Sequence, residues 1–300
     1  MRRFRTFLCV SSMVFIWSHA LCSEQLEGII DIHVHSEPDS RLRNVDAIDV
    51  ARLGRRHGVR ALLLKNHYTH TASLAYIVGQ VIPGIELYGG IVLNRSVGGI
   101  NPVAIKHMAA TTGGLGRVVW MPTFDSEHYT RTFAPNPNFV SISRDGNLLP
   151  EVEEVLLLIA RKNLSLATGH SSPKESILLI KAAKKAGVER IVVTHPMLPP
   201  VGMSVSLQKK AASLGAFLEY PFNALLPGGD VNYEDLIETL RAVGTEKAIL
   251  SSDLGQPMNP IHTDGLINYF ERLKSSGFTQ ESIDRMTKRN PAQFLGLPVQ

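Results

Sequence analysis

The sequence predicts an α/β fold, specifically a (β/α)8 TIM barrel, and three observations lead to this prediction. Short apolar runs alternate with longer helical patterns along most of the chain, which is the element order of a parallel sheet. About eight such runs occur, and eight parallel strands close a barrel. The length of 300 residues suits such a barrel with additions. An open doubly wound sheet is the alternative. No glycine-rich phosphate turn follows the first strand, which argues against a dinucleotide-binding version of that sheet.

The expected elements follow one another without a break in the alternation. The strands are expected at 28–35, 59–64, 87–93, 117–121, 164–168, 188–194, 216–220 and 247–252. Helices are expected at 45–57, 71–81, 102–112, 151–162, 173–186, 204–214 and 233–243, with extra C-terminal helices at 263–275 and 280–288. Residues 122–150 form an extended loop after the fourth strand. A connection of that length is usually functional and would lie beside a barrel's active site; the alternative is an exposed hairpin.

The first 22 residues have the pattern of a secretory signal peptide. Arg2, Arg3 and Arg5 precede an apolar run from Phe7 to Trp17, and small residues for cleavage follow. The run is too short for a membrane span, and Leu21 argues against lipidation of Cys22. We therefore expect an exported protein, periplasmic or secreted, with residues 23–300 as one domain.

The composition of the mature chain narrows its function. Without the three signal-peptide arginines, 28 basic residues face 27 acidic ones, so charge gives no indication of nucleic-acid binding. Cys9 and Cys22 are the only cysteines, which excludes an internal disulfide, a thiolate zinc site and a cysteine nucleophile from the mature chain. Any metal must be held by His, Asp, Glu or an oxygen derived from Lys.

The first strand ends in two histidines. Ile30, Ile32 and Val34 alternate with polar residues, so His33 and His35 would point to one side of the strand, about 7 Å apart along it. Two imidazoles at that separation can chelate one metal ion. Taken alone, the pair could equally be ordinary polar residues at the end of a strand.

Further polar residues stand at the ends of other expected strands. In a barrel these carboxyl ends meet at one mouth, and buried imidazoles there need partners that a metal supplies. The candidate metal ligands are His33, His35, Lys65, His170, His195 and Asp253. The remaining histidines are read as signal, surface or loop residues: His19, His57, His67, His70, His107, His128 and His262.

This arrangement resembles the amidohydrolase superfamily, and the chain would be an exported branch of it. The resemblance spans nearly the whole mature chain. The motifs that carry it are Asp31-Ile32-His33-Val34-His35, Thr168-Gly169-His170, Val193-Thr194-His195-Pro196, Ser251-Ser252-Asp253 and Asn290-Pro291-Ala292. The resemblance implies a barrel with a divalent metal, zinc being expected, and it says little about the substrate.

One departure concerns the number of metals. Binuclear members place a carboxylated Lys or a Glu after the fourth strand, where this chain has Trp120-Met121-Pro122-Thr123. Lys65 could become a carboxylated bridging ligand, since an apolar lead-in would lower its pKa, or it could bind a substrate carboxylate. Without a bridge, one ion would bind and His195 would be free for catalysis.

The resemblance also implies a reaction. A hydrolase would cleave an amide, lactone or related ester of a small molecule by metal-activated water, with Asp253 and His195 catalytic. Arg41, Arg95 and Arg144 lie in expected mouth loops and are candidates for substrate binding. The alternatives are a mononuclear-metal decarboxylase or other C–C lyase, and a non-catalytic binding protein on a degenerate barrel. The sequence leaves open whether the chain forms a homo-oligomer.

Overall fold

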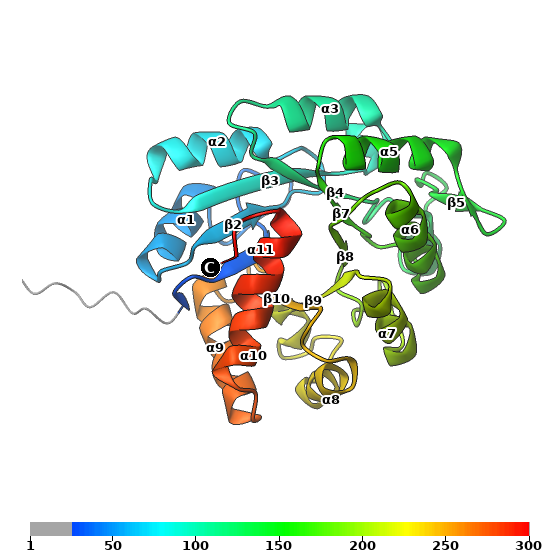
Figure 1. Cartoon of the computed structure of the whole chain (residues 1–300). Helices are drawn as coiled ribbons and strands as arrows, with labels where there is room; N and C mark the ends of the chain where they lie inside the picture. The colour runs from blue at the N-terminus through cyan, green and yellow to red at the C-terminus, as the bar shows by residue number, and fades with distance from the viewer. Residues whose placement is uncertain (1–25, 300) are drawn as a thin grey trace, which may run out of the picture.

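Eight parallel strands form a barrel in a computed structural model that describes residues 26–299 (Figure 1). The predicted signal peptide, 1–22, lies outside the described residues. The strands are hydrogen-bonded in the order β1-β2-β3-β4-β7-β8-β9-β10. The ring closes between the last strand and the first, because the Asp253 N–H donates to the His33 carbonyl at 2.9 Å and the His35 N–H donates to the Leu254 carbonyl at 3.0 Å.

The elements lie close to their expected positions. The barrel strands are β1 (Ile30–Val34), β2 (Ala61–Leu64), β3 (Glu86–Val92), β4 (Gly116–Trp120), β7 (Ser165–Ala167), β8 (Ile191–Val193), β9 (Phe217–Pro221) and β10 (Ala248–Ser251). The helices around them are α1 (Ala47–Arg56), α2 (Ala72–Val81), α3 (Pro102–Ala110), α5 (Pro150–Arg161), α6 (Pro173–Lys185), α7 (Val205–Ser213), α8 (Tyr233–Val243) and α9 (His262–Ser275). These bounds confirm the predicted TIM barrel.

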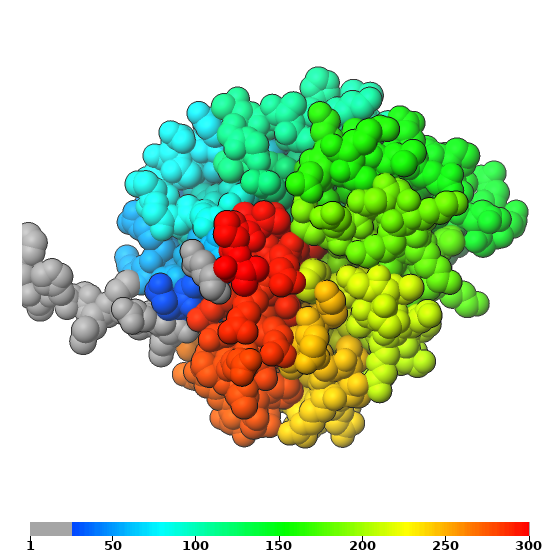
Figure 2. Space-filling view, in the orientation of Figure 1, coloured from blue at the N-terminus to red at the C-terminus, as the bar shows by residue number. Residues whose placement is uncertain are grey.

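The chain ends in a helical segment that closes one end of the barrel. Helix α10 (Gln280–Asp284), the π-helix η4 (Arg285–Arg289) and helix α11 (Asn290–Leu295) follow one another directly. Phe294 and Leu295 pack with the apolar side chains inside the barrel, among them Ile30 and Phe217. Asn290 anchors the segment by donating to the Ala248 carbonyl at 2.7 Å. The segment, drawn in red, covers the centre of the barrel and fills the middle of that face (Figures 1 and 2). The site must therefore lie at the opposite, carboxyl end of the strands.

The connection after β4 has two parts. One part lies beside the barrel mouth and the other is a hairpin, so both expected alternatives occur. Near β4, Phe124 and helix α4 (Glu127–Thr132) approach the barrel mouth. The ring centroids of Phe124 and Tyr129 lie 5.2 and 5.3 Å from that of His170. Farther along, β5 (Ser143–Arg144) and β6 (Asn147–Leu148) form a small antiparallel hairpin away from the barrel (Figure 1).

The larger apolar core lies between the strands and the surrounding helices. Leu62 and Leu64 on β2 and Val50 on α1 belong to it, and all three are buried. Burial of this kind is the main favourable contribution to folding. Within residues 26–299, no helix is both long and apolar enough to cross a membrane.

Candidate metal centre

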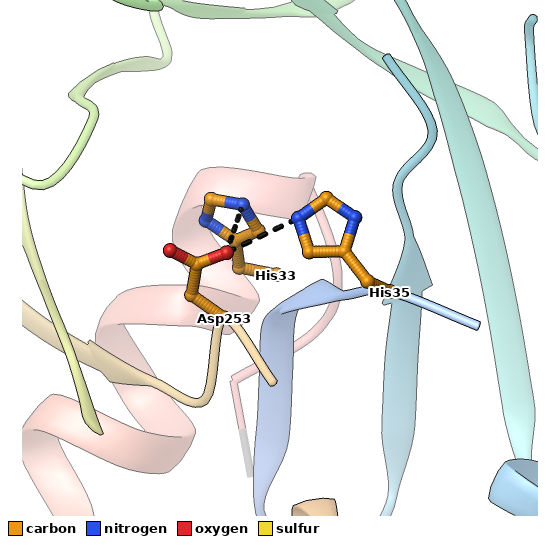
Figure 3. Close-up of side chains that lie close together, drawn as sticks. All are labelled: His33, His35 and Asp253. Carbon is orange, nitrogen blue, oxygen red and sulfur yellow. Dashed lines mark ion pairs between the residues drawn. The ribbon is translucent and has the colours of Figure 1, made fainter. Parts of the chain in front are cut away.

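His33 on β1, His35 just after it and an aspartate after β10 meet at the carboxyl end of the barrel (Figure 3). The Asp253 Oδ1 atom lies 3.0 Å from His33 Nε2 and 3.1 Å from His35 Nε2. One ligand atom from each residue lies within 4.8 Å of the others, and all three residues are buried. The predicted His-x-His pair and Asp253 therefore come together in one cluster.

The hydrogen bonds behind the two imidazoles decide which ring nitrogens face Asp253 as acceptors. His35 Nδ1 lies 3.1 Å from the Lys65 carbonyl oxygen, which can only accept, so Nδ1 must donate. His33 Nδ1 lies 2.7 Å from Glu219 Oε1 and donates in the same way when that carboxylate is ionised. In the neutral rings, both Nε2 lone pairs then point toward a carboxylate oxygen. A divalent cation satisfies that arrangement, and a partner on the far ring nitrogen is typical of metal-bound histidines.

Without a metal ion, protonation of His33 can also satisfy the contact between its Nε2 atom and Asp253, and the pKa shifts favour that protonation. Burial lowers the pKa of His33, but the Asp253 carboxylate raises it, to about 9 overall. Burial would raise the pKa of Asp253, yet His33 and His35 hold it well below its usual range. A proton and a metal ion compete for the same His33 lone pair, so metal binding would release that proton.

His170 and His195 supply two more imidazoles beside this cluster. Their ring centroids are 5.0 Å apart, and the His195 ring lies 6.2 Å from that of His33. Burial lowers the pKa of His195 to about 4 and that of His170 well below its usual value, so both rings are neutral at pH 7. The Nδ1 atom of each is buried without a hydrogen-bond partner among residues 26–299. Neutral imidazoles with unsatisfied buried nitrogens fit a metal site.

The backbone is strained at two of these candidate ligands. His195 has φ 28° and Asp253 has φ 49°, both in the left-handed region that residues other than glycine seldom occupy. Such strain persists only where the surrounding structure fixes it, and it concentrates at functional sites. Gly255 lets the Asp253 loop pass close to β1, since a Cβ there would lie 2.2 Å from the His35 carbonyl oxygen.

Lys65 extends from the end of β2 into the same cluster. Its Nζ atom lies 2.9 Å from His33 Nε2 and 5.8 Å from the centroid of the Trp120 ring. The residue is buried, and burial lowers the pKa of its amine to about 8. A substantial fraction of the amine is therefore neutral near pH 8 and able to react with CO₂. Lys65 therefore lies next to the His33–His35–Asp253 cluster.

Two residues next to the candidate ligands are not among the residues that the sequence predicts for the site. Glu219, in the middle of β9, is 1% exposed and bonded to His33 and to the Ser251 hydroxyl. Its position as a single acid inside the apolar strand β9 is the one feature of the sequence that could have indicated a role in the site. His67, which the sequence predicts to be a surface or loop residue, is buried, and its ring stacks on that of His35 at 5.0 Å. The same prediction is wrong for His262, which is 3% exposed and therefore buried.

A small cavity of about 190 Å³ opens over the cluster. Its lining includes all the predicted ligands except His33, together with His67, Phe124, Asn223 and Gln256. Of the predicted substrate-binding arginines, Arg41 lines this cavity. Arg95 is exposed, with its backbone N–H bonded to Asp125. Arg144 lies on the β5–β6 hairpin and lines a separate groove of about 850 Å³.

The fold and the residues together describe a barrel with a candidate histidine–aspartate metal site at the carboxyl ends of its strands. The chain belongs to a family of unknown function, DUF6282, which matches residues 28–219. None of the curated proteins matches the chain.

Solved structures share the fold at low sequence identity. An amidohydrolase from Pseudomonas aeruginosa is 13% identical with a TM-score of 0.62, over 91% of this chain and 96% of that one. Organophosphorus hydrolase from Deinococcus radiodurans is 16% identical with a TM-score of 0.61, over 91% of this chain and 93% of that one. The predicted amidohydrolase-type barrel is confirmed as a fold.

Proposed function

We propose that the protein is a metal-dependent hydrolase that cleaves an amide, lactone or related ester bond of a small molecule. The observation that carries the proposal is the convergence of His33, His35 and Asp253, with Asp253 Oδ1 within 3.1 Å of both Nε2 atoms. The structural neighbours named above include an amidohydrolase and an organophosphorus hydrolase, which supports a hydrolytic reaction on this fold.

A bound divalent ion, zinc in our proposal, would lower the pKa of water and polarise the scissile carbonyl. Side chains of the protein would carry out proton transfer and bind the carbonyl oxygen. Asp253 holds a carboxylate at the mouth of the barrel, takes a proton from the attacking water and delivers it to the leaving group. His195, neutral because of its burial, either donates a hydrogen bond to the carbonyl oxygen or serves as a further ligand. Phe124 and Leu198 give the cavity part of its apolar lining.

We further propose that Lys65 is carboxylated and allows two ions to bind. Its amine is buried, its pKa is lowered to about 8, and its Nζ lies 2.9 Å from His33 Nε2. Carboxylation would turn a cation that repels metal into an anionic oxygen ligand that attracts it. His170 and His195 would complete the second set of ligands.

A mononuclear decarboxylase is the second candidate function. The observation that favours it is the end of β4, where Trp120 is followed by Met121, Pro122 and Thr123 rather than by Lys or Glu. A decarboxylase would release CO₂ from an acid without consuming water, so the two reactions are separated by their products.

The test is a panel of small amides, lactones and esters given to zinc-loaded protein, with a paired panel of aromatic and β-keto acids assayed for CO₂ release. The hydrolase proposal predicts turnover of at least one compound in the first panel, lost in His33→Ala and retained in the exposed His107→Ala control. Turnover confined to the acids would favour the decarboxylase. Turnover that survives complete chelation would contradict both.

We also propose that the protein is exported, because residues 1–22 combine three arginines with an apolar run and small residues. Expression of the full chain should yield a periplasmic or secreted product shortened by about 22 residues. N-terminal sequencing of that product tests the proposal, and recovery of the unprocessed chain from the cytoplasm would overturn it.

A further inference from the structure

We propose that the substrate carries a carboxylate and that Arg41 binds it. This inference rests on the proposed function, because it names the substrate class of the same site. Arg41 lines the cavity that also exposes His35, Lys65 and Asp253. A reacting bond at the metal centre and a carboxylate at Arg41 would then lie within one small space.

The guanidinium of Arg41 is held in place by two aromatic residues. Its Nε donates to the Tyr68 hydroxyl at 2.8 Å. Its central carbon lies 4.2 Å from the centroid of the Phe124 ring and 5.6 Å from that of Tyr68. These contacts restrict the side chain and leave its terminal nitrogens as donors. A fixed planar guanidinium suits bidentate binding of a carboxylate.

Among residues 26–299, no acid forms an ion pair with Arg41. Asp39, close by in the chain, accepts from Arg43 Nε at 2.8 Å and Nη2 at 2.6 Å, so its charge is balanced by Arg43. Arg43 is therefore paired with Asp39, whereas, within the described part of the chain, Arg41 keeps an unpaired positive charge at the cavity.

The cavity itself favours a small anion. Asp253 is the one acid among its described lining residues, and a divalent ion would more than balance its charge. Leu198, Pro200 and Phe124 provide apolar surface for a short carbon chain or ring. The volume of about 190 Å³ falls below the roughly 300 Å³ at which pockets for drug-sized ligands begin. We infer a small organic acid with a hydrolysable bond a few atoms from its carboxylate.

The test is calorimetric titration of zinc-loaded protein with succinate and with its uncharged diamide, succinamide, which is similar in size. Wild type should bind succinate at least about ten-fold more tightly than succinamide, as expected for a charge-assisted pair. Arg41→Gln should bind succinate about ten-fold more weakly than wild type while its affinity for succinamide stays the same, and Arg41→Lys should keep part of the succinate affinity. Arg161→Gln, at the exposed end of α5, is the matched control and should behave as wild type.

Equal succinate affinity in wild type and Arg41→Gln would overturn the proposal, because the metal alone would then hold the carboxylate. Failure of wild type to prefer succinate would overturn it as well. Circular dichroism and zinc content measured on each variant verify that folding and metal loading are unchanged. Because binding is measured without turnover, absence of hydrolysis would count against the proposed function and not against the carboxylate site.

Discussion

Glu219 on β9 reaches across the barrel interior to His33 on β1, with its Oε1 atom 2.7 Å from His33 Nδ1. The Ser251 hydroxyl donates to the same oxygen at 2.8 Å and fixes it from the intervening strand β10. Burial would raise the pKa of Glu219, but His33 lowers it, so the carboxylate is ionised. Glu219 therefore sets which nitrogen of His33 faces Asp253, and it does so from inside the barrel.

We expect Glu219→Gln to weaken metal binding about 10- to 100-fold, the usual effect of removing such a partner from a ligating histidine. The amide is similar in size but carries no charge and accepts the His33 N–H less strongly. The measurement is a zinc competition titration with a chromophoric chelator. The exposed Glu246→Gln is the control, and wild-type zinc affinity in Glu219→Gln would contradict this role.

Asp253→Asn is expected to lower kcat by about 10²- to 10⁴-fold, the range for loss of a general acid–base group. The amide cannot accept the proton of the attacking water, while His33 and His35 still offer their Nε2 atoms to zinc. Steady-state kinetics with excess zinc measure the loss of kcat, and elemental analysis checks that the variant still binds zinc. A variant that keeps more than a tenth of wild-type turnover would exclude Asp253 as the proton carrier.

Lys65→Met should halve the zinc content, from two ions per chain to one, if Lys65 is carboxylated as we propose. Methionine keeps the apolar stem above Trp120 but cannot form the anionic oxygen ligand. Metal content and bicarbonate dependence of activity are measured on wild type, Lys65→Met and the exposed Lys106→Met. Unchanged zinc content in Lys65→Met would mean that the amine does not bridge two metals.

His262 makes folding stability depend on pH. Burial lowers its pKa from 6.5 to about 4. Between those values the unfolded chain binds a proton that the folded protein does not, so the free energy of unfolding falls as the pH falls. The loss is at most about 1.4 kcal/mol per pH unit, and about 2 kcal/mol from pH 7 to pH 5.

Urea unfolding of metal-depleted protein at pH 7, 6 and 5 tests this contribution. Since asparagine does not titrate there, His262→Asn should show a smaller loss of stability between pH 7 and pH 5 than wild type. The exposed His107→Asn is expected to retain the wild-type pH dependence. Identical pH dependence in His262→Asn and wild type would rule out the contribution.

Strand-end positions made most of the site predictable from the sequence. His33, His35, Lys65 and Asp253 were found because a barrel brings the carboxyl ends of its strands together, and the structure places them in one cluster. Glu219 could not be found in this way, since it lies within β9 and its role depends on His33, 186 residues away in the chain.

The C-terminal segment likewise has a role that depends on contacts with residues far away in the sequence. Helix α11 was not expected as a separate element, and its function of closing the barrel depends on contacts of Phe294 with residues from several strands. Local periodicity predicts that a segment is helical, but it does not predict which distant surface that segment covers.

We propose that His33, His35 and Asp253 hold a catalytic divalent metal. The most direct measurement is a crystal structure of zinc-loaded protein with anomalous data collected on both sides of the zinc absorption edge. We predict an anomalous peak between the two Nε2 atoms and Asp253, at about 2.0–2.2 Å from each ligand atom. A structure of active protein with no anomalous peak at this cluster would contradict it.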